Sequence, residues 1–165
     1  MSNRFEITSL PLGGGTLGIS PLPGHSGKLS ADLAAIGLFR PGLVISLTQQ
    51  AEMELLGGAE LPQGLLRASI PWAHFPVADF ATPEGETAAR WDGIANRARA
   101  VLAERGKVLV HCRAGRGRSG MVALRLMIEA GENPTAALAR LRRARPGAVE
   151  TEAQHQWALQ GRPAS

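Results

Sequence analysis

The chain has 165 residues, enough for one domain with a continuous core and too few for two comfortable ones. Hydrophobic residues make up 44% and charged residues 19%, a composition that excludes an intrinsically disordered chain. The net charge of +4 comes from basic residues spread along the sequence, and aromatic residues are only 4%, so we expect no nucleic-acid partner. We expect a single domain over residues 1–165 that acts as a monomer.

The N-terminal segment lacks a basic start followed by an apolar run, and no segment reaches transmembrane length, so we expect no signal peptide and no membrane span. Cys112 is the only cysteine, which allows no internal disulfide. A chain without disulfides suits a reducing compartment, and we therefore expect a cytoplasmic protein. A single cysteine also directs attention to its reactivity.

The three glycines at 13–15 predict a turn between two short N-terminal strands. The segment 30–42 predicts a helix that begins with Ser30 as N-cap and stops at a proline and a glycine. Its residues Leu33, Ile36 and Leu38 should lie near one face of that helix. The apolar run 44–47 then predicts a buried strand.

The segment 70–77 contains two prolines, which favour an extended chain, and it predicts another strand. The segment 82–106 predicts a helix with Thr82 as N-cap and Pro83 at the first helical position, because its apolar residues recur at helical spacing. Residues 108–111 predict a buried strand that leads into a glycine-rich turn. The rest of the chain predicts three helices, at 119–130, 134–145 and about 150–160.

Helices and strands alternate through the first two thirds of the chain, and this order predicts an α/β fold. We expect a central, mostly parallel twisted sheet flanked by helices, with a helical C-terminal third. The glycine-rich turn follows a predicted strand, and ligands bind at that end of the strands in such folds.

Gly115, Gly117 and Gly120 have the G-x-G-x-x-G spacing of a dinucleotide-binding loop. That fingerprint also needs a second strand ending in an acid about 20 residues further on. The sequence at that distance is the basic segment 137–147, which contains no acid and no predicted strand. A Walker loop is excluded as well, because no Gly-Lys-Ser/Thr follows at the required offset. The turn must serve another chemistry.

In the segment 111–119, HCRAGRGRS, five residues separate a cysteine from an arginine, and a serine follows that arginine. If the intervening residues curl around one point, their backbone N–H groups and the helix N-terminus make a cradle for a dianion. Arg118 can hold two phosphate oxygens through its planar fork. Cys112 at the base of this cradle would be a thiolate aimed at phosphorus. The residues expected around the phosphate are Arg113, Ala114, Gly115, Arg116, Gly117 and Arg118.

The pattern His111-Cys112, five residues, Arg118-Ser119 resembles the signature of the cysteine-based protein tyrosine phosphatases. An enzyme of this kind needs an acid to protonate the departing oxygen. Asp79 stands in a loop 33 residues before Cys112 and is the candidate. Glu84, Glu86 and Asp92 are weaker candidates, because they lie in or near a solvated helix face.

The acid precedes the cysteine loop, whereas low-molecular-weight tyrosine phosphatases and arsenate reductases have the opposite order. The chain also has the length of a minimal catalytic core and contains no tyrosine for a substrate-recognition loop. It therefore resembles the dual-specificity phosphatases. Segments 74–84 and 144–159, together with the cysteine loop, are most similar to the kinase-associated phosphatase type, and the likeness extends over about 19–159.

This resemblance implies further roles. His111 is expected to orient the loop through backbone contacts, with an ordinary core histidine as the alternative. Ser119 is expected to donate a hydrogen bond to the Cys112 thiolate and ease its departure. Gln154 matches a glutamine of the family's C-terminal helical region, where it would be a supporting residue, although a position on the helix surface is favoured. The mechanism needs no cofactor and no metal, and the remaining histidines lack metal-ligand spacing.

The resemblance thus implies a phosphomonoester hydrolase that works through a phosphocysteine intermediate. A phosphorylated protein is the favoured substrate, for a phosphotyrosine or dual-specificity phosphatase. Arg113 and Arg116 would raise the positive potential at the pocket mouth, and this favours the alternative of a phosphoinositide or another multiply phosphorylated small molecule. A non-catalytic phosphate-binding module is a third possibility. Hydrolysis of an aryl phosphate separates it from the other two.

Overall fold

The computed structural model describes residues 4–163. Its centre is a five-stranded sheet with the order β1-β2-β5-β3-β4. Only β1 runs antiparallel to its neighbour, and the other three pairings are parallel, so the predicted mostly parallel sheet is confirmed. The strands are β1 Thr8–Leu12, β2 Gly15–Ser20, β3 Leu43–Ser46, β4 Trp72–His74 and β5 Lys107–His111.

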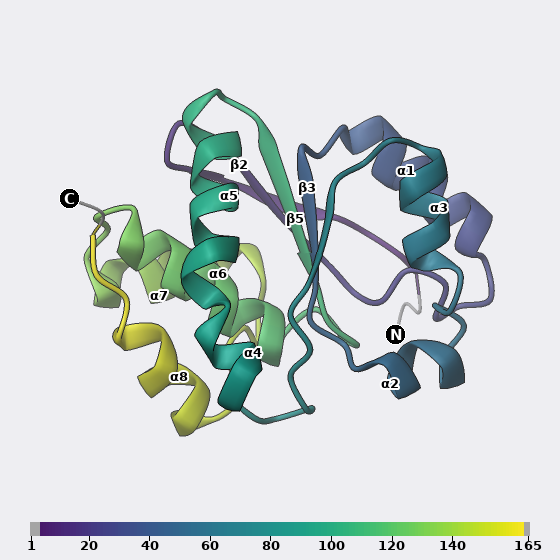
Figure 1. Cartoon of the computed structure of the whole chain (residues 1–165). Helices are drawn as coiled ribbons and strands as arrows, with labels where there is room; N and C mark the ends of the chain where they lie inside the picture. Colours follow the sequence, from purple (N-terminus) through teal and green to yellow (C-terminus); the bar gives the residue numbers. More distant parts are fainter. Residues whose placement is uncertain (1–3, 164–165) are drawn as a thin grey trace.

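Helices cover both faces of this sheet, as Figure 1 shows. One face carries α1 Leu29–Phe39, α2 Gln50–Leu55 and α3 Leu61–Arg67. The opposite face carries α4 Gly85–Ala89, α5 Trp91–Ala103, α6 Gly117–Glu129, α7 Pro134–Ala144 and α8 Glu152–Leu159. Within residues 4–163, no helix combines the length and apolar character that crossing a bilayer requires.

Alternating side chains of the central strands supply two hydrophobic clusters, because successive strand residues point to opposite faces. Val44 and Leu109 belong to the smaller cluster under α1 and α3. Their strand neighbours Ile45, Val108 and Val110 belong to the larger cluster, which also holds buried residues of α5, α6, α7 and α8. Both faces of the sheet are therefore buried, as expected for a parallel sheet.

The parallel strands end at one edge of the sheet. His111 at the end of β5 pairs in register with Ser20 of β2 on one side and with Ser46 of β3 on the other. The loops that follow β2, β3, β4 and β5 consequently start side by side. The cysteine loop leaves the central one of these strands and runs directly into α6.

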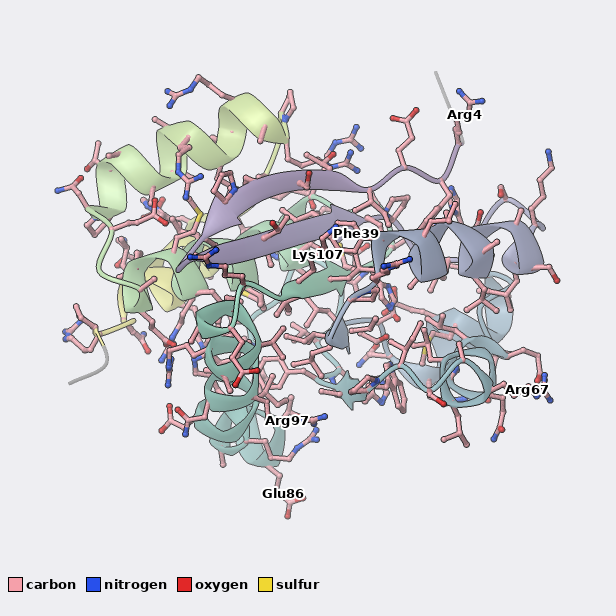
Figure 2. The ribbon with its side chains drawn as sticks, turned by 90° about the horizontal axis from the view of Figure 1, so that it is seen from above. Arg4, Phe39, Arg67, Glu86, Arg97 and Lys107 are labelled. Carbon is pink, nitrogen blue, oxygen red and sulfur yellow. The ribbon has the colours of Figure 1, made fainter. Side chains whose placement is uncertain are left out.

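At the opposite end of β5, helix α1 packs against the sheet through Phe39. Lys107 lies 4.9 Å above the ring of Phe39, and Figure 2 shows the two labelled residues side by side. The same ring packs against Gly18 of β2, where a Cβ atom would lie 2.7 Å from the Phe39 Cζ atom. Cation–π and close backbone contact fix α1 against the sheet at this end.

Two predicted helix starts are wrong. Helix α1 begins at Leu29 with Lys28 as N-cap, so Ser30 lies inside the first turn rather than at the cap. Its apolar face is centred on Ile36, which is fully buried, whereas Leu38 is 84% exposed. The α1 helix is apolar nearly all round, and this composition hides which face is buried.

The predicted helix over 82–106 is two helices, α4 and α5, which meet at Arg90. Thr82 and Pro83 belong to the preceding loop, and the N-cap of α4 is Glu84. Helices α2 and α3 were not predicted from the sequence. They have only 6 and 7 residues, too few turns to produce a clear hydrophobic period.

Candidate active site

The cysteine loop folds as the sequence predicts, around the start of α6. The backbone N–H of Gly115 points back at Cys112 and lies 3.3 Å from its Sγ atom. Helix α6 begins at Gly117, and among residues 4–163 no side chain caps its first turn. The unpaired N–H groups and the positive end of the helix therefore remain available to an anion.

Arg145 holds the outer side of this loop. Its Nε and Nη2 atoms donate to the carbonyl oxygens of Gly115 and Ala114, each at 2.8 Å. Because the C=O and N–H of a trans peptide point in opposite directions, the N–H groups of Gly115 and Arg116 point away from Arg145. Gly115 itself has a φ of +73°, and a Cβ atom there would lie 2.8 Å from the backbone of Ser20. In the sequence, nothing distinguishes Arg145 from the other arginines of the basic segment 137–147.

Arg118 is 1% exposed and lies in the middle of a hydrogen-bond network. Its Nη1 donates to Glu52 Oε1 at 2.7 Å and to the Val77 carbonyl at 2.9 Å, and its Nη2 donates to Glu52 Oε2 at 2.9 Å. Burial disfavours the charged guanidinium, but the hydrogen bond to Glu52 and the nearby negative charges outweigh it and raise the pKa of Arg118. The arginine is therefore a permanent cation.

The remaining donors of Arg118 identify how it can bind phosphate. A guanidinium has five N–H groups, and three are used by Glu52 and Val77. No group within residues 4–163 accepts a hydrogen bond from the buried Nε atom, and Nη2 has one further hydrogen, with Asp79 Oδ1 lying 3.4 Å from Nη2. These two neighbouring donors form the fork that a bound phosphate can take.

Glu52 is a site residue that was not expected from the sequence. It lies on the short helix α2, 66 residues before Arg118, and its carboxylate also accepts a hydrogen bond from the backbone N–H of Gln49. Burial alone would raise the pKa of Glu52, but the hydrogen bonds from Arg118 and Gln49 lower it below its ordinary value. The carboxylate stays charged and sets the plane of the guanidinium.

We expect Glu52→Gln to lower kcat/KM by about 10- to 100-fold, because the amide loses the charge-assisted pairing that orients Arg118. The inhibition constant of inorganic phosphate should rise as well, since the same fork binds the product. Glu54→Gln is the matched control, because Glu54 is exposed on the same helix and its carboxylate accepts a hydrogen bond from Gln50 rather than from Arg118. Equal kinetics for the two variants would contradict the positioning role.

Asp79 lies beside the cradle, on the loop after β4. Its Oδ1 atom accepts a hydrogen bond from the Phe80 N–H at 3.0 Å and lies 3.4 Å from Arg118 Nη2. The side chain is 36% exposed, so both water and a substrate oxygen can reach it. By contrast, Glu84, Glu86 and Asp92 are exposed in or next to α4 and α5, and none lines the pocket around Cys112.

Gln154 does not lie on a helix surface, contrary to the expectation that the sequence favoured. It is fully buried, and its Nε2 atom donates to the Ala81 carbonyl of the Asp79 loop at 3.2 Å. Its Oε1 atom accepts from the backbone N–H groups of Glu150 and Thr151. Gln154 thus ties the start of α8 to the loop that carries Asp79. Within the helical pattern of this segment, nothing distinguished a buried from an exposed glutamine.

His111 is fully buried below the cysteine loop. The Trp72 Nε1–H donates to Ser46 Oγ at 2.8 Å, the Ser46 hydroxyl is hydrogen-bonded to His111 Nε2, and His111 Nδ1 is 3.2 Å from the Cys112 carbonyl. This chain of donors suits a neutral imidazole with its proton on Nδ1. Burial lowers the pKa of His111 to about 4, which keeps the ring neutral. The predicted backbone contact is therefore present.

The buried histidine makes stability depend on pH. Between about pH 6.5 and 4 the unfolded chain binds a proton at His111 that the folded chain does not, so folding weakens as the pH falls through this window. We expect a loss of up to roughly 3 kcal/mol from this group. Urea denaturation at pH 7 and pH 4.5 measures it, with His111→Gln as the reference for all other groups. An equal decline in both proteins would refute the assignment.

The other predicted loop residues differ in their exposure and in their contacts. Ser119 is fully buried, and among the described residues its Oγ atom has no hydrogen-bond partner. The expected bond to Cys112 is therefore not formed in this structure, and the hydroxyl keeps its proton to donate. Arg113 and Ala114 are exposed and line the pocket mouth. Arg116 is exposed as well, and its Cδ and Nε atoms lie against Gly147.

The resulting pocket has a volume of about 260 Å³. It is lined by Asp79, Phe80, Cys112, Arg113, Ala114 and Glu150. Cys112 at its base is 2% exposed. A sulfur nucleophile, an arginine fork, open backbone donors and a carboxyl group thus meet at one small site.

Comparisons with known proteins agree with this geometry. Residues 28–158 match the family described as Swiss Army Knife protein, DSP-PTPase phosphatase domain. The comparison with curated proteins finds no match. Among solved structures, the chain is similar to kinase-associated phosphatase with its catalytic-site cysteine replaced by serine, at 24% identity over 96% of this chain and 94% of that one, with a TM-score of 0.83.

Two further structures share the fold. Tk-PTP in the active form is 27% identical over 93% of this chain and 95% of its own, with a TM-score of 0.71. PTPMT1 in complex with PI(5)P is 17% identical over 93% of each chain, with a TM-score of 0.70. These likenesses extend over the whole sheet and its helices rather than the cysteine loop alone.

Proposed function

Because the chain belongs to the dual-specificity phosphatase family of the cysteine-based protein tyrosine phosphatases, and is a cysteine-dependent phosphatase, we propose that Cys112, Arg118 and Asp79 perform its reaction. The observation that carries this assignment is the convergence of three separate segments. Cys112 and Asp79 line one pocket, and the Asp79 carboxylate lies 3.4 Å from the Arg118 guanidinium.

In the first step the Arg118 fork and the loop N–H groups hold the phosphate dianion over Cys112. The sulfur attacks phosphorus, a sulfur–phosphorus bond forms, and the bond to the ester oxygen breaks. Asp79 gives its proton to that oxygen, so the leaving group departs as an alcohol. The product of this step is a phosphocysteine and an ionised Asp79.

In the second step water attacks the phosphocysteine. Asp79 takes a proton from this water, the sulfur–phosphorus bond breaks, and inorganic phosphate is released. Cys112 leaves as a thiolate, and the unpaired hydroxyl of Ser119 is available to donate a hydrogen bond to it. Asp79 ends protonated and Cys112 ionised, ready for the next turnover.

The favoured substrate is a phosphorylated protein. A phosphoinositide is the second candidate, supported by the exposed Arg113 at the pocket mouth and by the likeness to a PTPMT1 structure that contains PI(5)P. An arginine at the mouth serves an acidic phosphopeptide equally well.

Acid quenching during steady-state turnover of an aryl phosphate tests the mechanism. We expect the peptide that contains Cys112 to carry the added mass of one phosphoryl group, because the intermediate is trapped before hydrolysis. Phosphate release with no modified peptide at any quench time would contradict the covalent route. Binding of the ester without any hydrolysis would show instead that the protein is a phosphate-binding module.

A further inference from the structure

The Asp79 loop, residues 75–81, is attached to the rest of the molecule at both ends. At its start, Phe75 is fully buried, and its backbone N–H donates to a carbonyl of β3 at 2.9 Å. At its end, the Ala81 carbonyl accepts the hydrogen bond from Gln154 of α8. Asp79 lies between these two attachments, so the position of its carboxyl group in the pocket depends on both.

Helix α8 contacts both ends of this loop. Trp157 lies one turn after Gln154 on α8, and residues three apart on a helix share a face. The ring centroid of Trp157 lies 6.4 Å from that of Phe75. Trp91 of α5 completes an aromatic cluster, with its ring centroid 5.5 Å from that of Phe75 and 5.1 Å from that of Trp157. A shift of α8 would therefore disturb the start and the end of the loop together.

Arg125 of α6 holds α8 in this position. Its Nη1 atom donates to the Trp157 carbonyl at 3.0 Å. Its guanidinium carbon lies 4.3 Å from the centroid of the Trp157 ring and 5.7 Å from that of Trp91. A cation over the face of an indole is attracted to the ring. Arg125 thus binds both the backbone and the side chain of the same α8 residue.

Glu129, one turn further along α6, fixes the orientation of Arg125. Its buried Oε2 atom accepts hydrogen bonds from Arg125 Nε at 3.0 Å and from Trp91 Nε1 at 2.9 Å. Its Oε1 atom accepts from Arg99 Nη1 of α5 at 2.7 Å. A buried ion pair adds little stability over an apolar pair of the same size, because desolvation offsets the attraction. What this network supplies is a defined geometry between α5, α6 and α8.

We propose that Arg125 is a positioning residue for the catalytic acid and acts through α8. By holding Trp157, Arg125 fixes the helix whose Gln154 binds the end of the Asp79 loop. The carboxyl group of Asp79 is then kept where it can reach the leaving oxygen. This inference rests on the proposed function, in which Asp79 is the proton donor.

Arg125→Met tests this role, because methionine keeps an unbranched side chain against the indole rings and removes the charge and the donors. The Trp157 carbonyl still accepts the Gln160 N–H at 3.2 Å, so it is not left unpaired. The measured quantity is the ratio of kcat/KM for phenyl phosphate to that for 4-nitrophenyl phosphate. We expect this ratio to fall by about 3- to 10-fold, since the more basic leaving group depends more on the proton of Asp79.

Arg99→Met is the matched control. Arg99 pairs with the same Glu129 carboxylate, but its Nη2 atom donates to Asn96 within α5. The ratio should therefore keep its wild-type value. A partly unfolded preparation does not alter the ratio, because both esters are measured on the same protein. An unchanged ratio in Arg125→Met, or an equal decrease in Arg99→Met, overturns the positioning role.

A second substitution keeps the test decisive if Arg125→Met does not fold. Arg125→Lys retains the charge, but one ammonium group cannot bind the Glu129 carboxylate and the Trp157 carbonyl as the two ends of a guanidinium do. We expect the ratio to fall in this variant too. An unchanged ratio in Arg125→Lys then overturns the inference.

Asp79→Asn separates this inference from the proposed function. Adding Arg125→Met to Asp79→Asn should leave the ratio unchanged, because the proton that Arg125 helps to place is already absent. A further decrease in the double variant overturns the inference, since Arg125 would then act on another group. If Asp79→Asn alone does not lower the ratio, the proposed function is overturned and this inference with it.

Discussion

Replacing Cys112 by serine should lower the hydrolysis of every phosphate ester by roughly 10³-fold or more. The serine hydroxyl is not ionised at neutral pH and is therefore a far weaker nucleophile than a thiolate. Binding should persist, because the backbone N–H groups and the donors of Arg118 do not depend on the sulfur. Isothermal titration with an aryl phosphonate and an assay of phosphate release measure the two properties separately.

The size of the substituted side chain does not explain such a loss. Cys112 is 2% exposed, and the smaller hydroxyl fits the same space. Arg118→Lys provides the contrasting control, since lysine replaces the planar fork by a point charge and should weaken binding and rate together. Substantial turnover by Cys112→Ser would mean that another group attacks phosphorus.

Asp79→Asn has the second largest expected effect, a decrease in phosphoryl transfer of roughly 10²-fold or more. The asparagine oxygen can still accept the Phe80 N–H, so the turn that Asp79 caps should be preserved. What is lost is the proton for the departing oxygen. The decrease should be greatest for esters with poor leaving groups and should shrink for an activated aryl phosphate, whose anion leaves unaided.

The pH profile gives an independent check of the same residue. The high-pH limb of kcat/KM reports loss of the proton from the catalytic acid, so it should flatten in Asp79→Asn. The low-pH limb, which depends on Cys112 and the substrate phosphate, should remain. If the decrease is the same for all leaving groups and both limbs persist, Asp79 only positions its loop. Glu84 and Asp92 would then be tested next.

The contacts of Arg118 show why these effects are coupled. Glu52 fixes one edge of the guanidinium, and Asp79 lies next to the donors on the other. A phosphate that takes the free donors therefore arrives beside the acid that must protonate its leaving oxygen. Gln154 also holds the Asp79 loop in place, because its amide donates a hydrogen bond to the Ala81 carbonyl.

The sequence alone was sufficient for the phosphate loop, the mostly parallel sheet and the family. The loop 111–119 is one continuous segment, so the sequence spacing of its cysteine, glycines and arginine determines how these residues can surround a phosphate. Alternating strands and helices predicted the α/β sheet because their periods are local properties of the chain. The position of Asp79 before the cysteine identified the candidate acid, and its catalytic role stays a prediction.

The tertiary structure decided which distant residues support that loop. Glu52 lies 66 residues from Arg118 and Gln154 lies 73 residues from Ala81, and nothing in the local pattern of either helix marks these contacts. The contacts of Arg145 with the cysteine loop are likewise not visible in the sequence, where Arg145 is one of several arginines in the basic segment 137–147. A charged or polar side chain takes its role from its partner, and the partner depends on the strand order that brings the loops together. Sequence periodicity reports which face of an element is buried, but it does not report what that face meets.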